Sequence, residues 1–308
     1  MTHYKIIVNP TSGRGEGGQS IPEIERLLTE HGLDYELVRT NAPGHAIQLA
    51  KEAAAAGFEV VVSAGGDGTA NEVLNGLVQA SQAGLGKAAI GVIPVGRGND
   101  YCFGVKVPMG LAEACQVLAD DQRQTIDVGY VEGGDYPEGR YFGNGVGVGF
   151  DAVVGFEALK LKRLHGFPSY IVGALKTIFL YYTAPTVRLE FNERLIEQRA
   201  LMVSIMNGRR LGGGFMMAPE GSMEDGLFDL SIADQVSKAK IFYLMLRFMA
   251  GTQATHPAIH TYQTSELSIT SVNGSLPAHM DGETLCEAGE ALQLKLIPAV
   301  LEVVTIKG

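Results

Sequence analysis

Three glycines surround one carboxylate in the run Gly65-Gly66-Asp67-Gly68-Thr69. Glycine has no Cβ, so its backbone can adopt positive φ and its N–H groups can approach a ligand closely. The β-branched run before these residues predicts a buried strand, and apolar residues at helical spacing from Val73 to Val78 predict a helix after them. The glycines are therefore expected in a strand-to-helix turn. Thr69 is expected to N-cap the helix, whose first N–H groups would attract a phosphate.

Asp67 places a carboxylate beside this expected phosphate, and two anions at short range repel unless a cation lies between them. A bridging Mg²⁺ is the simplest solution. The alternative is an ordinary Asp-Gly turn with a helix cap. Two other phosphate motifs are excluded. The sixth position of a G-x-G-x-x-G that starts at Gly66 is Asn71, and the run Gly13–Gly18 is followed by Gln19 where a P-loop needs Lys.

The elements that must position this turn alternate along the first 130 residues. Strands are expected at Tyr4–Val8, Asp34–Arg39, Glu59–Ser63, Ala88–Pro94 and Thr125–Val131, and helices from about Gly18, Gly44, Thr69 and Gly110. Such alternation predicts a mostly parallel sheet covered on both faces, with ligands at the carboxyl ends of its strands. Four loops should meet at that edge: Asn9–Gly13, Thr40, Gly65–Thr69 and Pro94–Asn99.

The second half of the chain, after residue 131, is rich in β-type residues instead. The segment Tyr141–Gly149 has glycine at alternate positions, which lets another backbone or a ligand lie against that strand. Hairpin turns are predicted at Phe191–Arg194 and Val272–Ser275. We therefore predict an antiparallel, sandwich-like half. Helices are expected within it near Asp151–Thr183 and from Ser237 to Met249.

Composition bounds the class of protein. A chain of 308 residues, 46% hydrophobic and 19% charged, is typical of a globular protein with room for two domains. The net charge of −10 argues against nucleic acid as a partner. No signal peptide is expected, and the longest apolar stretch, Tyr170–Tyr182, is too short for a membrane span. Three cysteines without C-x-x-C spacing indicate neither a disulfide framework nor a zinc site, so we expect a cytoplasmic protein.

The glycine turn followed by Asn71-Glu72 resembles the nucleotide motif of the diacylglycerol kinase superfamily, which includes sphingosine and ceramide kinases and is distantly related to NAD kinases. Four further motifs follow in family order: Asn9-Pro10-Thr11-Ser12-Gly13; Pro94-Val95-Gly96 with Asn99-Asp100; Gly212-Gly213-Gly214 with Ala218-Pro219 and Asp225-Gly226; and Asp281-Gly282-Glu283. The resemblance spans nearly the whole chain. It implies an α/β nucleotide domain at residues 1–130, a β-rich lipid-substrate domain at 131–297, and a tail at 298–308 that returns to the first domain.

The resemblance also implies ATP as the phosphate donor. The nucleotide-binding residues that it implies are Asn9, Pro10, Thr11, Ser12, Gly13, Thr40, Gly65, Gly66, Asp67, Gly68, Thr69, Asn71, Glu72, Gly96, Arg97 and Asn99. Arg97 stands where the family motif usually has Thr, so a guanidinium that can grip phosphate oxygens in pairs replaces a hydroxyl. A structural Mg²⁺ is implied at Asp225 with Ser222 and Leu227, since oxygen ligands suit a hard cation. The alternative there is a plain hairpin turn.

Asp281 and Glu283 are the catalytic candidates, together with Asp67. Phosphoryl transfer needs positioned substrates, cations on the developing charge and a base near the attacking hydroxyl. If the backbone is extended, the side chains of Asp281 and Glu283 project to opposite faces, so one would be the base and the other would orient it or bind a metal. Which one is the base stays open, and a solvated turn is the alternative. The histidines, His279 among them, lack H-E-x-x-H spacing and are interpreted as structural or exposed.

We therefore predict an ATP- and Mg²⁺-dependent lipid kinase that phosphorylates the hydroxyl of diacylglycerol or a related lipid alcohol. An NAD kinase-like phosphotransferase and a catalytically silent nucleotide-binding regulator are the alternatives. The basic residues Lys160, Lys162, Arg163 and His165 indicate either a solvated helix face or a docking face for anionic lipid. Transient peripheral contact with the inner face of the membrane is expected, and a homodimer is compatible with the sequence.

Overall fold

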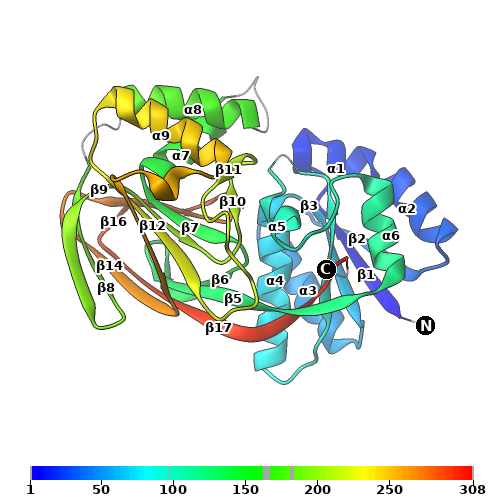
Figure 1. Cartoon of the computed structure of the whole chain (residues 1–308). Coiled ribbons are helices and arrows are strands. Elements are labelled where there is room, and N and C mark those ends of the chain that lie inside the picture. The colour runs from blue at the N-terminus through cyan, green and yellow to red at the C-terminus, as the bar shows by residue number, and fades with distance from the viewer. Residues whose placement is uncertain (1, 97, 162–166, 181–183, 307–308) are drawn as a thin grey trace. The chain divides into compact units, whose positions relative to one another are not determined.

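The computed structural model of the chain describes residues 2–96, 98–161, 167–180 and 184–306 (Figure 1). The chain divides into two compact units. The first unit comprises Met1–Asp127 together with Pro298–Gly308, and the second comprises Val128–Ile297. The fold is the predicted combination of an α/β part with parallel strands and a β-rich part.

Four parallel strands form the sheet of the first unit: β1 (His3–Val8), β2 (Asp34–Arg39), β3 (Val60–Gly65) and β4 (Ala89–Pro94). Their order is β4-β3-β1-β2, and all three neighbouring pairs are parallel. Strands β3 and β4 are buried along their whole length, as expected for uninterrupted apolar runs covered on both faces. The last strand of the chain, β17 (Ala291–Val304), also reaches this sheet, where Val303 pairs with Ile90.

Several helices of this unit pack on one another. The helices are α1 (Glu16–Gln19), α2 (Ile21–Glu30), α3 (His45–Ala55), α4 (Asp67–Gln82), α5 (Asp100–Gly104) and α6 (Leu111–Asp120). Helix α3 packs on α4, and α2 packs on α6. The prediction that Thr69 caps α4 is wrong, because Gly66 is the N-cap residue and Thr69 lies inside the first turn. The strand extends to Gly65, two residues beyond the predicted end, so the helix begins at once.

The fifth predicted strand does not join the parallel set. It is β5 (Arg123–Gly133), which runs antiparallel to β6 (Tyr136–Phe142) and also pairs with β17. Its middle residues, from Ile126 to Gly129, are buried like those of β3 and β4, although its two ends are exposed or partly exposed. Burial alone therefore does not distinguish a parallel neighbour from an antiparallel one.

Two sheets form a sandwich in the second unit, and they share one long strand. The remaining strands of the unit are β7 (Gly145–Gly149), β8 (Thr186–Phe191), β9 (Arg194–Met206), β10 (Arg210–Leu211), β11 (Phe215–Met216), β12 (Phe228–Asp234), β13 (Ile259–Thr264), β14 (Glu266–Asn273), β15 (Leu276–Met280) and β16 (Glu283–Gly289). The first part of β9 pairs with β8 and leads to β14 and β17, and its second part pairs with β7 and β12.

Alternation along β9 separates two apolar cores. Val203 and Ile205 face the core between the two sheets, whereas Met202 and Met206 belong to a second core. That second core lies beneath helices α7 (Phe150–Leu159), α8 (Phe167–Leu180) and α9 (Lys238–Ala250), which Figure 1 shows on one side of the strands. In the described ranges, no helix is long and apolar enough to cross a membrane.

Of the two predicted hairpins, one is confirmed and one is wrong. Asn192 and Glu193 connect β8 to β9 with φ of 48° and 59°, the positive values of a tight hairpin turn. The segment Val272–Ser275 instead passes from one sheet to the other, because β14 pairs with β8 and β17 while β15 pairs with β7 and β16. Turn-forming residues predict a change of direction without determining which strands pair afterwards.

Candidate functional site

The parallel order of β1 to β4 places the loops after these strands at one edge of the sheet. Backbone hydrogen bonds continue between neighbouring strands into these loops. The N–H of Asn9 donates to the Ala64 carbonyl (3.0 Å), and that of Thr40 donates to the Val8 carbonyl (2.9 Å). The Val95 N–H likewise donates to the carbonyl of Gly65 (3.0 Å). Each loop therefore starts from a fixed position at the carboxyl edge, where ligands of such sheets bind.

Asn9 joins the first loop to the glycine turn. Its Nδ2 donates to Thr69 Oγ1 (3.1 Å), and its Oδ1 accepts from the N–H and the hydroxyl of Thr11 (3.1 and 2.9 Å). Pro10 and Ser12 lie in the same turn, which continues into the short 3₁₀ helix η1 (Ser12–Arg14). Thr69 thus receives a hydrogen bond from the neighbouring loop instead of capping its own helix.

Glycines allow the loops after β3 and β4 to come together. A Cβ on Gly96 would overlap with the Gly66 backbone, and a Cβ on Gly98 would lie 2.7 Å from Asp67 Oδ2. Asn99 closes the second loop, since its Oδ1 accepts from the Gly96 N–H (3.2 Å) and its Nδ2 donates to the Gly96 carbonyl (3.1 Å). Arg97 lies outside the described residues. Close backbone approach of this kind is what glycine permits and other residues prevent.

Asp67 is held in the first turn of α4, against the segment that follows β4. Its Oδ1 accepts from the N–H of Tyr101 at 2.9 Å. The carboxylate is therefore fixed where the glycine turn meets the positive end of α4. An arrangement of this kind can hold a cation, and through it a phosphate, in a set position.

Asn71 and Glu72, two of the implied nucleotide-binding residues, make contacts that support helices. The Glu72 carboxylate accepts from the N–H groups of Gly44 (2.8 Å) and Ala46 (3.0 Å) at the start of α3. Asn71 is buried, and its Oδ1 accepts from Nδ2 of Asn75 at 3.1 Å. Glu72 satisfies N–H groups that have no partner within their own helix, and its charge complements the helix dipole.

The Asp225 loop provides oxygen atoms for a cation. Asp225 Oδ1 accepts from the N–H of Leu227 (3.0 Å), and Ser222 Oγ accepts from the N–H of Glu224 (3.2 Å). Within the described ranges, three or more histidine, cysteine or acidic side chains never gather as a metal cluster. A magnesium ion here would therefore depend on carbonyl oxygens as well as carboxylates.

Asp229 is an acidic residue near this loop that the sequence reasoning missed. Its Oδ2 is buried and accepts no hydrogen bond from the part of the chain that the structure describes. Burial raises the pKa of Asp229; a hydrogen bond from Gln263 opposes this shift, and the charge of Asp225 adds to it. A cation near Asp225 and Asp229 would offset both the burial of the Asp229 carboxylate and its repulsion by the charge of Asp225. These residues therefore fit Mg²⁺. The alternation Phe228-Asp229-Leu230 was a signal that one polar residue in this strand faces differently.

Asp281 lies in the turn between β15 and β16, so the backbone is not extended there, which is the condition under which Asp281 and Glu283 would project to opposite faces. Asp281 and Gly282 have φ of 47° and 82°, and Met280 pairs directly with Glu283. An Asp-Gly pair favours this two-residue turn over an extended path. Asp281 is buried, whereas Glu283 is exposed. The two carboxylates therefore differ in environment.

Three backbone N–H groups donate to the Asp281 carboxylate. Gly143 donates to Oδ2 (2.8 Å), and Asn144 and Gly145 donate to Oδ1 (2.9 and 3.0 Å). The Asp281 N–H also donates to the Gly145 carbonyl (3.0 Å). Asp281 thus holds the connection between β6 and β7, and most of its lone-pair positions are already occupied.

An apolar pocket lies beneath helices α7, α8 and α9 of the second unit. The residues that line it are Phe150, Asp151, Val154, Tyr170, Ala174, Leu201, Met202, Leu211, Gly212, Phe215, Met217, Ala233, Ile241, Leu244, Met245 and Phe248. Asp151 is the single charged residue among them. Sequence reasoning missed this pocket, because each helix or strand contributes only a few ordinary apolar residues and no motif connects them.

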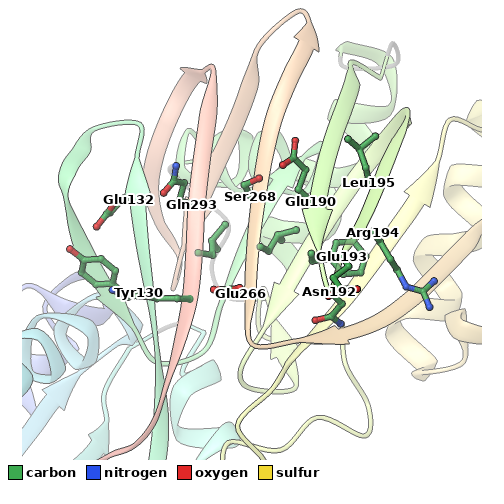
Figure 2. Close-up of a pocket in the computed structure, with 14 residues that line it drawn as sticks. Tyr130, Glu132, Glu190, Asn192, Glu193, Arg194, Leu195, Glu266, Ser268 and Gln293 are labelled. Atoms are coloured by element: carbon green, nitrogen blue, oxygen red, sulfur yellow. The ribbon is translucent and has the colours of Figure 1, made fainter.

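A larger depression, about 670 Å³ in volume, lies on the strands β5, β17, β14 and the β8–β9 hairpin (Figure 2). Its polar lining includes Glu132, Glu190 and Glu266. Lys295 Nζ, which also lines it, lies 5.0 Å from the centre of the Tyr130 ring. Carboxylates that face one depression repel a phosphate. This hollow is therefore unsuited to a nucleotide and contains none of the predicted motifs.

Three members of the predicted basic cluster, Lys162, Arg163 and His165, lie outside the described residues. Lys160 Nζ lies 2.7 Å from Glu157 Oε1, and Lys176 contacts the same carboxylate.

Comparison with known proteins extends the resemblance to both units. A model described as "Diacylglycerol kinase catalytic domain" matches residues 3–131, and one described as "YegS C-terminal NAD kinase beta sandwich-like domain" matches residues 144–305. The diacylglycerol kinase of Bacillus subtilis is 28% identical over 286 residues, 92% of this chain and 90% of that protein. That of Staphylococcus saprophyticus is 27% identical over 281 residues, 91% of this chain and 88% of that protein.

Solved structures share the fold. A diacylglycerol kinase structure from Bacillus anthracis matches with a TM-score of 0.74 at 20% identity and covers 99% of this chain and 97% of its own. Yeast NADH kinase in complex with NADH matches with a TM-score of 0.51 at 10% identity, covering 100% of this chain and 84% of its own. At such identities the structural matches support the fold alone.

Proposed function

Because the chain belongs to the diacylglycerol kinase-like family, we propose that it is a lipid kinase that transfers the γ-phosphate of ATP to the hydroxyl of diacylglycerol or a related lipid alcohol. The observation that carries the proposal is the position of Asp67. This carboxylate is held by the Tyr101 N–H in the first turn of α4, where two glycine loops meet at the carboxyl edge of the sheet. A phosphate donor needs such a fixed, cation-binding carboxylate beside open backbone N–H groups.

The apolar pocket favours a lipid as the acceptor over a dinucleotide. NAD carries two phosphates and many hydroxyls, and burying these among Met, Phe and Leu side chains would cost free energy without hydrogen bonds in return. An acyl chain gains free energy when it leaves water for the same surroundings. The pocket therefore supports the lipid branch of the family.

In the reaction, a lipid hydroxyl oxygen attacks the γ-phosphorus of ATP, its O–H bond breaks, and the bond from that phosphorus to the bridging oxygen of ADP breaks. We assign the proton to one of two carboxylates, Asp281 or Glu283. The role of the first unit is to hold ATP through the backbone of Gly65–Gly68 and the loop closed by Asn99. Asp67 would hold Mg²⁺, which supplies charge neutralisation at the phosphates when it is bound. Asp225 and Asp229 would hold a second, structural Mg²⁺.

A lipid kinase must reach the bilayer, and we assign the contact to the face formed by α8 and α9. Apolar side chains are exposed there: Val172, Leu175 and Phe179 on α8, and Phe242, Tyr243 and Leu246 on α9. Phe179 is 73% exposed, and Lys238 Nζ lies 5.0 Å above its ring, so the two helices meet at this point. Exposed aromatic residues beside lysines suit an anionic bilayer at the inner face of the membrane.

The activity is tested with γ-labelled ATP, Mg²⁺ and a panel of lipid alcohols in mixed micelles, with NAD as a parallel acceptor. We expect label in the lipid phase for at least one alcohol and none in NAD. Label in NAD alone would replace the proposal with an NAD kinase. Binding of ATP without transfer to any acceptor would indicate a silent nucleotide-binding protein.

The membrane face is tested by co-sedimentation with vesicles that contain phosphatidylglycerol. We expect Phe179→Ser to weaken vesicle binding, since it removes the most exposed apolar side chain of the face. Leu195→Ser is the matched control, because Leu195 is 63% exposed on the β8–β9 hairpin, away from α8 and α9. Equal binding by both variants would contradict this assignment.

A further inference from the structure

One acidic side chain, Asp151 in the first turn of α7, enters the apolar pocket. Its Oδ2 is buried and accepts no hydrogen bond from the residues that the structure describes. A carboxylate among apolar side chains costs free energy unless a donor reaches it. The fold nevertheless keeps a carboxylate at this place, among side chains that are otherwise almost entirely apolar. A ligand with a hydroxyl group would provide the donor.

His279 on β15 lies beside this carboxylate. Its Nε2 is 3.3 Å from Asp151 Oδ2, and the two side chains are only 10% and 16% exposed. Asp151 lies on helix α7 and His279 lies on strand β15, so the two residues are far apart in sequence. The formation of the pair therefore depends on the packing of α7 against β15.

Gly147 leaves space for the pair. It lies opposite His279 in the pairing of β7 with β15, and a Cβ built on it would overlap with both Asp151 Oδ2 and His279 Nε2. Any other residue would push the carboxylate or the imidazole away. Among the alternating glycines of this strand, Gly147 therefore has a specific role, which is to leave space for the Asp151 and His279 side chains.

The pocket wall is adaptable. Met202, Met217 and Met245 line it, and methionine side chains adjust to irregular apolar shapes at low cost. The cavity measures about 60 Å³, room for only a few water molecules, so a lipid chain must displace these side chains as it enters. The polar group of the lipid would meet Asp151.

We propose that Asp151 is the hydroxyl-binding residue of this pocket. Before ATP binds, it accepts a hydrogen bond from the free hydroxyl of an uncharged acyl lipid whose chain lies along the methionines, and His279 is a positioning residue that orients the carboxylate. The same hydroxyl passes its proton to Asp281 or Glu283 only when it attacks ATP. This inference rests on the proposed function, since it names where the acceptor lipid binds. It also predicts which chemical class of acceptor lipid the pocket prefers.

The preferred class is a neutral alcohol. A phosphate headgroup is repelled by the carboxylate, and an ammonium group would have to leave water for a site whose one carboxylate already lies 3.3 Å from the His279 ring nitrogen. A hydroxyl donates one hydrogen bond and has a far smaller desolvation cost. Diacylglycerol has this chemistry, and amino alcohols do not.

The test measures binding of three ligands without ATP: dioctanoylglycerol, its methyl ether, and the analogue with an amine in place of the hydroxyl. Calorimetry with the full chain provides the affinities. In the wild type we expect the alcohol to bind at least 10-fold more tightly than the ether, the scale for one hydrogen bond to a charged group. In Asp151→Asn the ratio should fall to about 2-fold or less.

Asp135→Asn is the matched control, since Asp135 is an exposed aspartate of the same unit, and it should keep the wild-type ratio. His279→Asn should lower the ratio partly and non-additively with Asp151→Asn, as expected for coupled residues. The KM for ATP should stay within 2-fold of the wild-type value in all variants.

The outcomes separate the two proposals. If the wild type phosphorylates lipid alcohols but binds the alcohol and its ether equally, the role of Asp151 is wrong and the proposed function stands. Tighter binding of the amine would overturn the preference for a neutral alcohol. If the wild type neither binds nor phosphorylates any lipid alcohol, the proposed function itself fails. Because the ligand comparison uses the wild-type protein, equal binding of the alcohol and the ether would overturn the role of Asp151 even if a variant does not fold.

Discussion

The loops at the edge of the first unit and the apolar pocket of the second unit are built in opposite ways. The loops consist of short runs of consecutive residues, such as Gly65–Thr69, whose backbone groups are brought together by neighbouring parallel strands. The pocket consists of single side chains from separate helices and strands. A site made from consecutive residues leaves a motif in the sequence, whereas a site made from dispersed side chains leaves only ordinary apolar periodicity.

The carboxylates in the two regions differ in the same way. Asp67 has a backbone donor, the Tyr101 N–H, and therefore keeps its position without a ligand. Asp151 instead has His279 beside it, at 3.3 Å. The first arrangement suits a fixed cation site, and the second suits a group that completes its hydrogen bonding when a ligand arrives. Substitutions in each region therefore test whether the two regions serve different substrates.

The largest effect is expected for Asp67→Asn. The amide keeps the Oδ1 acceptor for Tyr101 but loses the charge that would hold Mg²⁺ at the phosphates. Turnover should fall about 10³-fold, the scale for removing one group that stabilises transition-state charge. Steady-state kinetics measures the fall, with Asp34→Asn, an exposed aspartate on β2, as control. Near-native turnover in Asp67→Asn would show that this region is not the phosphate site.

Gly96→Ala should separate the two substrates. The added Cβ would overlap with Gly66 and force the two loops apart, so kcat/KM for ATP should fall about 10²-fold while binding of lipid is retained. Gly155→Ala in α7 is the control, because it adds the same methyl group at a glycine where there is space for it. A Cβ there meets no atom within 4 Å, and alanine should stabilise the helix by about 0.5–1 kcal/mol. Equal loss of both substrates in Gly96→Ala would contradict the division between the regions.

Asp281→Asn and Glu283→Gln should distinguish a carboxylate that stabilises the fold from one that takes part in catalysis. Both variants should bind ATP with near wild-type affinity, and at least one should lose about 10²-fold in turnover, the usual scale for a positioned base. Asp281→Asn should in addition lose about 1–3 kcal/mol of folding free energy, because an amide NH₂ then faces backbone N–H groups. Thermal melting measures this loss. If both variants remain fully active, the proton acceptor lies elsewhere.

A smaller effect is expected for Asp225→Ala, measured as the rise in melting temperature on adding Mg²⁺. A metal bound only by the folded state stabilises that state by mass action, so the wild type should gain a few degrees and the variant less. Calcium-free buffer and an EDTA baseline provide the control. A wild-type melting temperature that does not respond to Mg²⁺ would make this loop a plain turn.

The smallest effect concerns Asp229 in the absence of metal. Burial raises the pKa of Asp229 above its ordinary value of 3.8, so between these two values the folded state binds more protons than the unfolded state. Its contribution to stability is therefore present below pH 3.8 and is lost as the pH rises through the raised pKa. Asp229→Asn should be more stable than the wild type above this window and lose the advantage below it. Urea unfolding across pH measures the difference, and an unchanged difference would contradict the assignment.

Much of the first unit was predictable from sequence, because its signals are local. Apolar runs such as Val60–Val62 predict buried strands, and glycines at their ends predict turns. The structure confirms the strand Asp34–Arg39 at its predicted bounds. In the second unit it confirms the hairpin at Phe191–Arg194, which is likewise a local signal. The predicted N-cap at Thr69 lies about one turn after the observed N-cap residue, Gly66. Nothing in the sequence showed that β3 continues to Gly65.

Pairing between distant segments could not be read from the sequence. The partners of β5 and the change of sheet after β14 depend on which long-range contacts bury the most apolar surface, and many pairings satisfy the same local pattern. For the same reason, the sequence left open whether Asp281 lies in an extended segment or a solvated turn, whereas the structure places it in a tight turn that is buried beneath three backbone donors from the β6–β7 connection.

The sequence by itself determined the family, the order of elements in the first unit and the glycine turn with its carboxylate, because each depends on consecutive residues. Only the tertiary structure decided that Asp151 and His279 meet across Gly147 and that methionines from separate elements line a pocket together with Asp151. Side chains that are far apart in sequence become neighbours only when helices pack on a sheet. A histidine without a motif around it therefore looked structural until β15 placed it beside an acid.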